Sequence, residues 1–474
     1  MINLKDIVSA LTGHTIPLLD QPISSAVIDS RQAVKGSLFI ALPGEQVDGH
    51  DYVQSAFDNG AILALINKDL NAGLNVLDLR KGHFQPHLSH EIMLPLCLRV
   101  EDALSALHAI ASHWRQAHPV RTIGITGSVG KTSTKELIAA LLSQQASVLK
   151  NPGNRNNEIG LPLTLLELEP QHQYAVLEMG FYVPGEIQTL CEIARPHVGV
   201  VTNIGMVHAE RAGSQAVIAK GKAELVESLP PAPEGVAVLN MDDPWVQKMA
   251  EKTKARVLSY GVTEQSDLMP RDIQTHGLEG ISCILTVDGE DHVIHSPLLG
   301  AFSAYTILCA AAVALTEGLE WPAITAGLAE SHVDLRMRPI HLPDGTIILD
   351  DTYNASPTST IAALALLREL SGRRVAVLGD MLELGQYELI GHQNVGIAAA
   401  SAADALILIG ERSKIIADAA LNEGFAPEHI QWFPDSIQAA AQISGLVQQG
   451  DVILVKGSNI MRMDRVLTAL KGGL

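Results

Sequence analysis

The sequence predicts an α/β protein with three domains: a small α/β N-terminal domain, a central domain built on a mostly parallel sheet, and a C-terminal doubly wound, Rossmann-like domain. Two observations predict this class. Short apolar runs alternate with helical patterns along the chain, which is typical of parallel sheets covered by helices. The chain has 474 residues, 47% of them hydrophobic, which is too long for one core and suggests about three domains.

Residues 1–119 make up the first predicted domain. Its apolar runs SLFIAL and AILALI are typical of short strands, and the segments PGEQVDGHD and DNGA are typical of turns. An amphipathic pattern over residues 101–118 predicts a helix at the end of the domain. These features indicate a small α/β domain that precedes the larger sheets.

Residues 120–332 and 333–474 make up the second and third predicted domains. Each contains apolar runs separated by helical patterns, which indicates a parallel sheet. Ligands of such sheets bind beyond the carboxyl ends of the strands. The runs are TIGIT, YAVLEMG, HVGVVTNI and GVAVLN in the second domain, and TIILDD, RRVAVLGD, ALILIG and DVILVKGS in the third.

The charge balance and the cysteines argue against several classes of protein. The 33 basic and 52 acidic residues leave a net charge of −19 without any basic run, so we expect no nucleic-acid partner. The four cysteines contain no C-x-x-C pair, which argues against a zinc site or a disulfide framework. The first residues do not resemble a signal peptide. We therefore expect a cytoplasmic protein, and we expect it to be a monomer.

Residues 297–316 form an uncharged segment whose length would permit a membrane span. The segment is rich in alanine, contains Gly300, Ser303, Tyr305 and Thr306, and lacks basic flanks. We therefore predict a buried core helix here and no membrane insertion.

The segment from Ile123 to Glu136, IGITGSVGKTSTKE, predicts a phosphate-binding loop. A strand-like run leads into the glycine-bearing turn, and a helical pattern follows it. Successive backbone N–H groups would then point into one concavity at the positive end of a helix dipole. The standard P-loop pattern would require glycine where this chain has Ile125, so the loop is a shortened G-x-x-G-K-T version. The alternative is a strand-to-helix turn with an incidental lysine.

The residue types in this loop predict an ATP site with Mg²⁺. Lys131 would reach the β- and γ-phosphates, and the hydroxyl of Thr132 would ligate Mg²⁺. The predicted nucleotide contacts of the loop are Gly127, Ser128, Val129, Gly130, Lys131, Thr132 and Ser133.

Two residues at the ends of other apolar runs are candidate metal ligands. Mg²⁺ prefers oxygen ligands, so Glu178 at the end of YAVLE forms a candidate set with Thr132. His208 follows HVGVVTNI, and we predict that it serves a second metal. The alternatives are a solvated strand-end glutamate and a structural histidine.

Asparagine and aspartate mark two further candidate contacts. Four asparagines fall within NPGNRNNEIGLP, residues 151–162, and we assign Asn157 to the substrate, although an ordinary loop is the alternative. Asp350 and Asp351 close the run TIILDD, and one of them could bond a ribose hydroxyl. A cap or Asx turn is the alternative and could hold for the other.

Taken together, these residues resemble the Mur ligase family over all three predicted domains. ITGSVGKTS is similar to the family's phosphate loop, and NRNNEIGLP and LEMG follow in family order. DSRQAVKGSLFIALPGEQVDGHDY, residues 29–52, resembles the segment that receives a UDP-sugar, which implicates Ser30 and Arg31. NIGMVHAERAGSQAVIAKGKAE resembles the family's histidine and modified-lysine helix. It implies that Lys222 is carbamylated and joins His208 at a second Mg²⁺; the alternatives are that Lys220 takes this role or that Lys222 is an ordinary surface lysine.

The third domain points to one activity within the family. DDTYNASP, VLGDMLELG and VKGS are similar to segments of the member that uses D-alanyl-D-alanine, and the D-N-P-R segment typical of the meso-diaminopimelate-adding member is absent. The resemblance implies an ATP-dependent amide ligase of peptidoglycan precursor synthesis. It would join D-alanyl-D-alanine to the terminal carboxylate of UDP-N-acetylmuramoyl-tripeptide through an acyl phosphate. The resemblance also implies Asn240 near adenine, Arg336 at the γ-phosphate, Asp351 at the ribose, and Tyr353 and Asn354 at the substrate.

The sequence departs from the family at two places. After Gly300 the family usually carries two asparagines. Here these two positions, which follow Phe302 in the chain, are Ser303 and Thr306. We therefore expect weak adenine recognition on this side and greater reliance on Asn240. Residues 181–183 are more apolar than the resemblance leads us to expect. The alternatives are another Mur-type ligase, a folylpolyglutamate synthase, or a P-loop kinase or regulatory ATPase.

Overall fold

The computed structural model describes residues 2–14, 21–44, 47–70, 73–84, 93–206, 209–331 and 337–473. These residues form two compact units. The first unit contains residues 1–124, 145–180 and 186–197, and the second contains residues 125–144, 181–185 and 198–474. The three-domain division at residues 119 and 332 stays a prediction.

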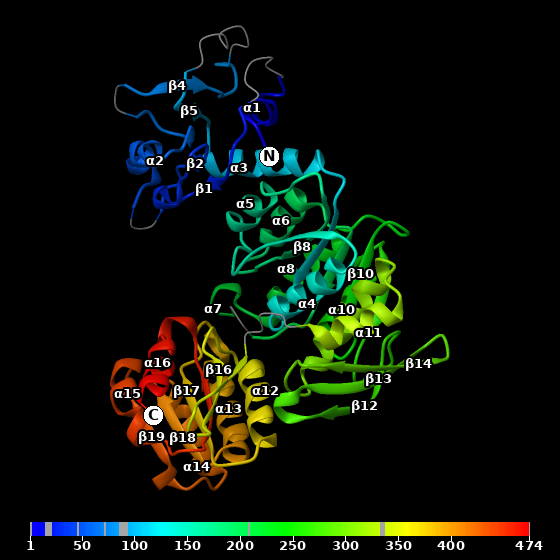
Figure 1. Cartoon of the computed structure of the whole chain (residues 1–474), viewed down its shortest axis with the longest axis vertical. Helices are drawn as coiled ribbons and strands as arrows, with labels where there is room; N and C mark the ends of the chain where they lie inside the picture. Colours follow the sequence, from blue (N-terminus) through cyan, green and yellow to red (C-terminus); the bar gives the residue numbers. More distant parts are fainter. Residues whose placement is uncertain are drawn as a thin grey trace. The chain divides into compact units, whose positions relative to one another are not determined.

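The first unit contains a five-stranded, fully parallel sheet with the strand order β1-β2-β3-β5-β4 (Figure 1). The predicted runs form β2 and β3, and the predicted helix forms α3, so the α/β prediction for this region is confirmed. The elements are α1 (Leu4–Thr12), β1 (Ala26–Val27), β2 (Leu38–Ile40), α2 (Val53–Asp58), β3 (Leu63–Ile66), β4 (Asn75–Asp78), β5 (Leu96–Arg99) and α3 (Ala103–Gln116).

The rest of the first unit follows α3. Strands β7 and β8 are parallel, and β8 ends at Glu178, as the apolar run predicts. Strand β6 begins in the first unit and ends in the second, where the phosphate loop follows it. The elements are β6 (Arg121–Thr126), β7 (Ser147–Lys150), α5 (Gly160–Leu165), β8 (His172–Glu178) and α6 (Glu186–Ala194).

The first part of the second unit contains the parallel strands β9, β10 and β11. Helix α10 packs against α4, β10 and β11, and its residues from Thr306 to Ala314 are buried. The prediction of a core helix is therefore confirmed, and no described helix has the length and apolar character that crossing a bilayer requires. The elements are α4 (Lys131–Ser143), β9 (Val198–Val201), α7 (Ala209–Ala212), α8 (Gln215–Glu227), β10 (Val236–Asn240), α9 (Pro244–Gln247), β11 (Arg256–Tyr260), α10 (Ser303–Thr316) and α11 (Trp321–Glu330).

A three-stranded antiparallel sheet, which the sequence analysis does not predict, precedes α10. It consists of β12 (Pro270–Thr275), β13 (Ile281–Val287) and β14 (Glu290–Ser296). Asp288 and Gly289 make the tight turn between β13 and β14, and both have positive φ angles. Such a pair is typical of a two-residue hairpin.

The C-terminal part of the second unit is doubly wound, as predicted. Its sheet has the order β15-β16-β20-β17-β18-β19, and only β15 is antiparallel to its neighbour. Helices α12, α13 and α14 cover one face, and α15 and α16 cover the other (Figure 1). The elements are β15 (Arg338–His341), β16 (Ile347–Asp351), α12 (Pro357–Glu369), β17 (Arg374–Gly379), α13 (Glu388–Ala402), β18 (Ala405–Ile409), α14 (Ser413–Asn422), β19 (Ile430–Phe433), α15 (Ser436–Gln442), β20 (Val452–Lys456) and α16 (Asp464–Gly473).

Arg115 is a buried cation that joins several segments of the first unit. Its guanidinium donates to Thr122 Oγ1 at 3.0 Å and to the carbonyl oxygens of Ala194, His118 and Val120 at 2.9–3.0 Å. Burial, together with the charge of Arg195, lowers the pKa of Arg115 to about 10.

We expect Arg115→Met to destabilise the first unit, because it leaves these buried acceptors without their donor. The expected loss is about 3 kcal/mol, since each buried polar group left unpaired costs roughly 1–3 kcal/mol. Calorimetry should show a lower Tm. Arg256→Met, at an exposed position of β11, is the control and should leave the Tm unchanged. Equal Tm values for the two variants would contradict the assigned role.

Candidate active site

The phosphate loop, residues 127–130, connects β6 to α4, and two of its positions require glycine. Gly127 has a φ of 148°, and a Cβ atom there would lie 1.8 Å from Thr202 Oγ1. Gly130 has a φ of 87° and precedes the first residue of α4, Lys131. The backbone must take these conformations to turn from strand to helix, and glycine adopts them without steric cost.

Residues that follow β9 support the loop. The N–H groups of Ser128 and Val129 donate to the backbone oxygen and to Oδ1 of Asn203, both at 2.9 Å. Thr202 Oγ1 donates to the carbonyl oxygen of Val129 at 2.7 Å. The sequence predicts that successive N–H groups share one concavity, but those of Ser128 and Val129 are held by Asn203. The N–H groups in the first turn of α4 are therefore better placed for an anion than those of Ser128 and Val129.

Two lysine ammonium groups meet at one carbonyl oxygen of the loop. Lys131 Nζ donates to the oxygen of Gly127 at 2.7 Å, and Lys222 Nζ donates to the same oxygen at 3.0 Å. Lys222 lies on α8 and is 2% exposed, whereas Lys220 is exposed. The geometry thus brings Lys222, not Lys220, to the loop. Two cations so close repel each other, so the site favours anions.

The apolar segment at residues 181–183 has a packing role. The ring of Phe181 lies 5.1 Å from Lys222 Nζ and covers Gly221, where a Cβ atom would come within 2.0 Å of the ring. The Arg211 guanidinium lies 4.9 Å from the ring centre of Tyr182. The aromatic faces therefore contact cations in this region, which explains two of the three unexpected residues.

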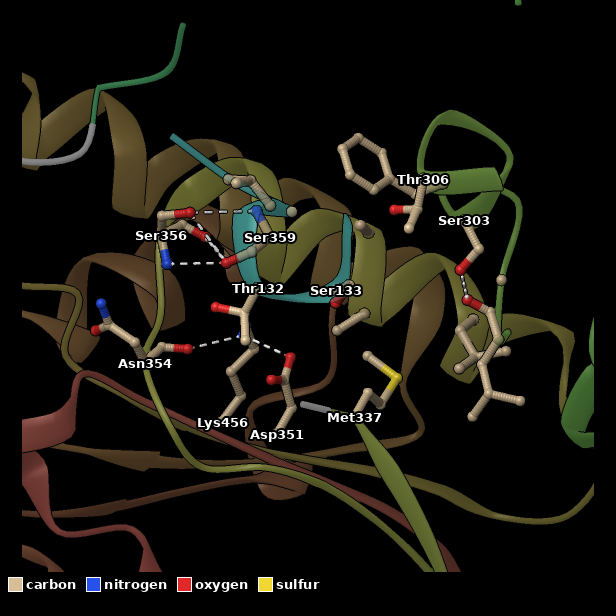
Figure 2. Close-up of a pocket in the computed structure, with 18 of the residues that line it drawn as sticks. Thr132, Ser133, Ser303, Thr306, Met337, Asp351, Asn354, Ser356, Ser359 and Lys456 are labelled. Carbon is tan, nitrogen blue, oxygen red and sulfur yellow. Dashed lines mark hydrogen bonds and ion pairs between the residues drawn. The ribbon is translucent and has the colours of Figure 1, made fainter. Parts of the chain in front are cut away.

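A cavity of about 180 Å³ adjoins the first turn of α4 (Figure 2). Its lining combines apolar side chains, among them Leu298, Leu299 and Leu366, with charged and polar groups. A nucleotide combines the same two kinds of group, since its phosphates and sugar are polar and the faces of its base are apolar. The polar lining comes from the phosphate loop with Thr132 and Ser133, from Ser303 and Thr306 of α10, and from Asp351, Asn354 and Lys456.

The two aspartates at the end of β16 have different surroundings. Asp350 Oδ1 accepts hydrogen bonds from the N–H and the hydroxyl of Thr352, at 3.2 and 2.7 Å, as in an Asx turn. Asp351 lines the cavity and pairs with Lys456. Asn354 also lines the cavity, whereas Tyr353 is 40% exposed. The geometry agrees with a turn role for Asp350 and leaves Asp351 as the ribose candidate.

Asn240 lies away from the cavity lining that the structure describes. Its Nδ2 donates to the carbonyl oxygen of Thr202 at 2.9 Å, and its Oδ1 accepts from the N–H of Asp242 at 3.1 Å. The amide thus joins the ends of β9 and β10, and its role near adenine stays a prediction. Ser303, at one of the two positions where the family usually carries asparagine, donates from Oγ to the carbonyl oxygen of Leu299 at 2.6 Å (Figure 2).

Tyr305 and Asp242 form a contact next to this amide. The Tyr305 hydroxyl donates to Asp242 Oδ2 at 2.8 Å. Burial opposes ionisation of Asp242, but the N–H groups of residues 262–264 and the Tyr305 hydroxyl outweigh it and lower the pKa of Asp242. Burial, and then this hydrogen bond, raises the pKa of Tyr305. The pair holds the start of α10 against the loop that follows β11.

Four predicted site residues belong to the first unit. Ser30 is buried, and Arg31 is exposed and paired with Asp29 at 2.7 Å. Asn157 Oδ1 accepts from the N–H of Gly160 at 2.9 Å, as a loop or cap residue would. Glu178 is 1% exposed, and its Oε1 accepts from Asn156 Nδ2 at 2.8 Å. Asn156, which the sequence analysis does not single out, therefore positions the candidate metal ligand.

Two predicted site residues, His208 and Arg336, lie outside the described residues, so their roles stay predictions. Among the described residues, no group of three histidine, cysteine or acidic side chains could hold a metal. Sequence reasoning also missed Asn203 and gave Lys456 no role. The available signal was similar for both, since Lys456 ends a buried parallel strand and Asn203 lies two residues after the end of another.

Three parts of the chain match known domains: residues 125–314 match the Mur ligase middle domain, residues 335–459 the Mur ligase, glutamate ligase domain, and residues 22–115 the Mur ligase family, catalytic domain. A UDP-N-acetylmuramoyl-tripeptide–D-alanyl-D-alanine ligase from Synechocystis sp. is 37% identical over 459 residues, or 95% of this chain and 92% of the relative. The chain belongs to the Mur ligase family.

Solved structures of Mur ligases have a similar fold. MurF from Acinetobacter baumannii superposes with a TM-score of 0.85 at 28% identity and covers 98% of both chains. The MurF ligase from Thermotoga maritima in complex with ADP has a TM-score of 0.79 at 26% identity, over 96% of this chain and 98% of that one. As a Mur ligase, the chain is an ATP-dependent ligase, which removes the kinase and the regulatory ATPase from the alternatives.

We expect Gly127→Ala to weaken ADP binding by about 100-fold, the scale on which loss of one preorganised anion contact acts. The added methyl group would meet Thr202 Oγ1 at 1.8 Å, so the loop and the carbonyl shared by both lysines must move. Titration calorimetry with ADP and Mg²⁺ measures the effect.

The control is Gly345→Ala, at another glycine with positive φ but with no atom within 4 Å of the new Cβ. It should bind ADP like the wild type. Unchanged ADP affinity in Gly127→Ala would show that the loop tolerates displacement and that its geometry does not determine how tightly ADP binds.

Proposed function

We propose that this Mur ligase joins D-alanyl-D-alanine to the terminal carboxylate of UDP-N-acetylmuramoyl-tripeptide, with ATP converted to ADP and phosphate, in peptidoglycan precursor synthesis. The observation that carries the proposal is the pair of lysines at Gly127 beside a cavity that extends to Asp351. The relatives named for this reaction support the same substrates. We further propose that the enzyme is a cytoplasmic monomer.

The reaction first brings two anions together. The tripeptide carboxylate must attack the γ-phosphorus of ATP, and two unit charges at ~4 Å repel by about 4 kcal/mol at an effective dielectric constant of 20. Lys131 would reduce this repulsion at the β- and γ-phosphates and hold the phosphates for in-line displacement. Arg336 would act at the γ-phosphate in the same way. The new O–P bond gives an acyl phosphate as the bond to ADP breaks.

The second step forms the amide. The neutral amine of D-alanyl-D-alanine attacks the acyl carbon, the carbon–oxygen bond to phosphate breaks, and the amine loses a proton. Because water would hydrolyse an acyl phosphate, the cavity must exclude it while the intermediate is present. Tyr353 and Asn354, in the segment after β16, are proposed substrate contacts, and so is Asn157.

The donor set suits Mg²⁺. A threonine hydroxyl and a glutamate carboxylate are hard oxygen ligands, and the phosphates of ATP would complete the shell. Thr132 lines the cavity, and Glu178 is held by Asn156. Bound Mg²⁺ would neutralise phosphate charge. Carbamylated Lys222 and His208 would provide oxygen and nitrogen ligands for a second ion.

Recognition of the UDP-sugar is assigned to the first unit. Ser30 and Arg31 follow β1, a strand of the fully parallel sheet, at the edge where ligands of such sheets bind. Arg31 is exposed and can pair with the diphosphate.

A substrate panel tests the proposed function. Phosphate release should require ATP, UDP-N-acetylmuramoyl-tripeptide and D-alanyl-D-alanine together, and mass spectrometry should find the amide product. Parallel reactions with the dipeptide precursor plus meso-diaminopimelate, and with a folate plus glutamate, test the two alternative ligases. Product in either of these reactions, and none with D-alanyl-D-alanine, would contradict the proposal.

We expect Lys222→Ala to lose most activity, at least about 100-fold, and to regain part of it with added formate or acetate. A carbamate turns the cation of Lys222, next to Lys131, into an anion. When the side chain is removed, a small carboxylate can take the place of the carbamate. Lys220→Ala, at an exposed position on the same helix, should keep full activity. Carbon-13 NMR in labelled bicarbonate should detect the carbamate. A fully active Lys222→Ala enzyme would contradict this role.

A further inference from the structure

A buried ion pair joins the ends of two neighbouring strands at the wall of the cavity. Strands β16 and β20 are parallel, and their register places Asp351 opposite Lys456. The Lys456 Nζ lies 2.5 Å from Asp351 Oδ2. Lys456 is 2% exposed and Asp351 is 7% exposed. Both side chains line the cavity below Thr132 in Figure 2.

Stability alone gives a weak reason for such a pair. Removing two charges from water is costly, and well-packed apolar residues of similar volume are often as stable or more so. A second pair at the other end of β20, Arg373 with Asp451 at 2.7 Å, connects residues away from the described cavity lining. The pair at the carboxyl end differs from it because both of its side chains line the cavity, which points to a role toward the ligand.

Lys456 restrains two groups with one ammonium. Besides Asp351, Nζ donates to the carbonyl oxygen of Asn354 at 2.9 Å (Figure 2). These bonds fix the strand end and the segment after it relative to each other. Lys456 engages Oδ2 of Asp351, and among the described residues no hydrogen bond to Oδ1 is found, which leaves that oxygen available to a hydroxyl donor.

We propose that Lys456 is a positioning residue for the nucleotide: it holds the Asp351 carboxylate so that its second oxygen accepts a hydrogen bond from a ribose hydroxyl of ATP. The proposal rests on the proposed function, because it places the ribose beside Asp351. It adds a residue for which the sequence gives no role. It also couples ribose recognition to Asn354, the candidate substrate contact.

A rival role for Lys456, direct contact with a phosphate, would have a different effect on nucleotide affinities. An ammonium group has three donors, and two are used by Asp351 and Asn354, so the third could contact a phosphate directly. Loss of a phosphate contact would weaken the binding of all adenine nucleotides by the same factor. Displacement of the Asp351 carboxylate would instead weaken the binding only of those nucleotides that carry the hydroxyl it recognises.

The experiment measures Kd values by titration calorimetry for ADP, 2′-deoxyADP and 3′-deoxyADP with Mg²⁺. The wild type should prefer ADP over at least one deoxy analogue by roughly tenfold, the scale of a hydrogen bond to a charged group. Lys456→Gln should bring this ratio close to one. Asp351→Asn should do the same, and the double variant should lose no further preference, because Lys456 acts through Asp351.

Arg373→Gln is the matched control, since it breaks the pair at the opposite end of the same strand and should keep the wild-type ratio. If Lys456→Gln does not fold, two other variants can be measured in its place. The double variant Lys456→Gln with Asp351→Asn leaves no unpaired charge, and Lys456→Met fills the same space as the lysine. An unchanged ratio in the folded variants would overturn the proposal. These titrations contain no peptide substrate, so their outcome is independent of whether the substrate panel identifies the proposed reaction.

Discussion

The carbonyl oxygen of Gly127 accepts hydrogen bonds from two lysines on different helices, and the rest of the site depends on this meeting point. Lys131 comes from α4 and Lys222 from α8, so one backbone oxygen fixes both helices relative to the phosphate loop. The contact of Gly127 with Thr202 leaves no room for a side chain. Two cations at one oxygen repel each other, and either phosphate charge near Lys131 or the proposed carbamate on Lys222 would relieve this repulsion.

This local concentration of positive charge matters because the chain as a whole has a net charge of −19. The proposed substrates, ATP and a UDP-linked peptide, are themselves polyanions that the global field would repel. Lys131 at the loop and Arg31 in the first unit are local exceptions to that field. In the proposed mechanism, binding and phosphoryl transfer would rely on a few positioned cations and on metal ions held by the oxygen ligands.

Much of the fold follows from patterns that one sequence carries. Buried parallel strands are continuous apolar runs, so β6, β8, β9, β10, β16, β17, β18 and β20 are all found at predicted runs. The hairpin of β13 and β14 was missed although Asp288 and Gly289 are a strong turn signal between alternating strands.

Other features depend on strand order, which a single sequence does not specify. Strand β20, the last in the chain, inserts between β16 and β17 and so brings Lys456 to Asp351 across 105 residues. In the same way, Asn203 reaches the phosphate loop across 74 residues, and Phe181 covers Lys222 only because distant segments pack together. The phosphate loop was predictable because all of its parts are local in the chain.

The central claim is that the tripeptide carboxylate is activated as an acyl phosphate on this enzyme, and oxygen transfer tests it most directly. UDP-N-acetylmuramoyl-tripeptide labelled with ¹⁸O in its terminal carboxylate is allowed to react with ATP and D-alanyl-D-alanine, and the released phosphate is examined by ³¹P NMR. The account predicts one ¹⁸O atom in each phosphate, because the carboxylate oxygen leaves with phosphorus when the amide forms. Unlabelled phosphate formed together with the amide product would contradict it.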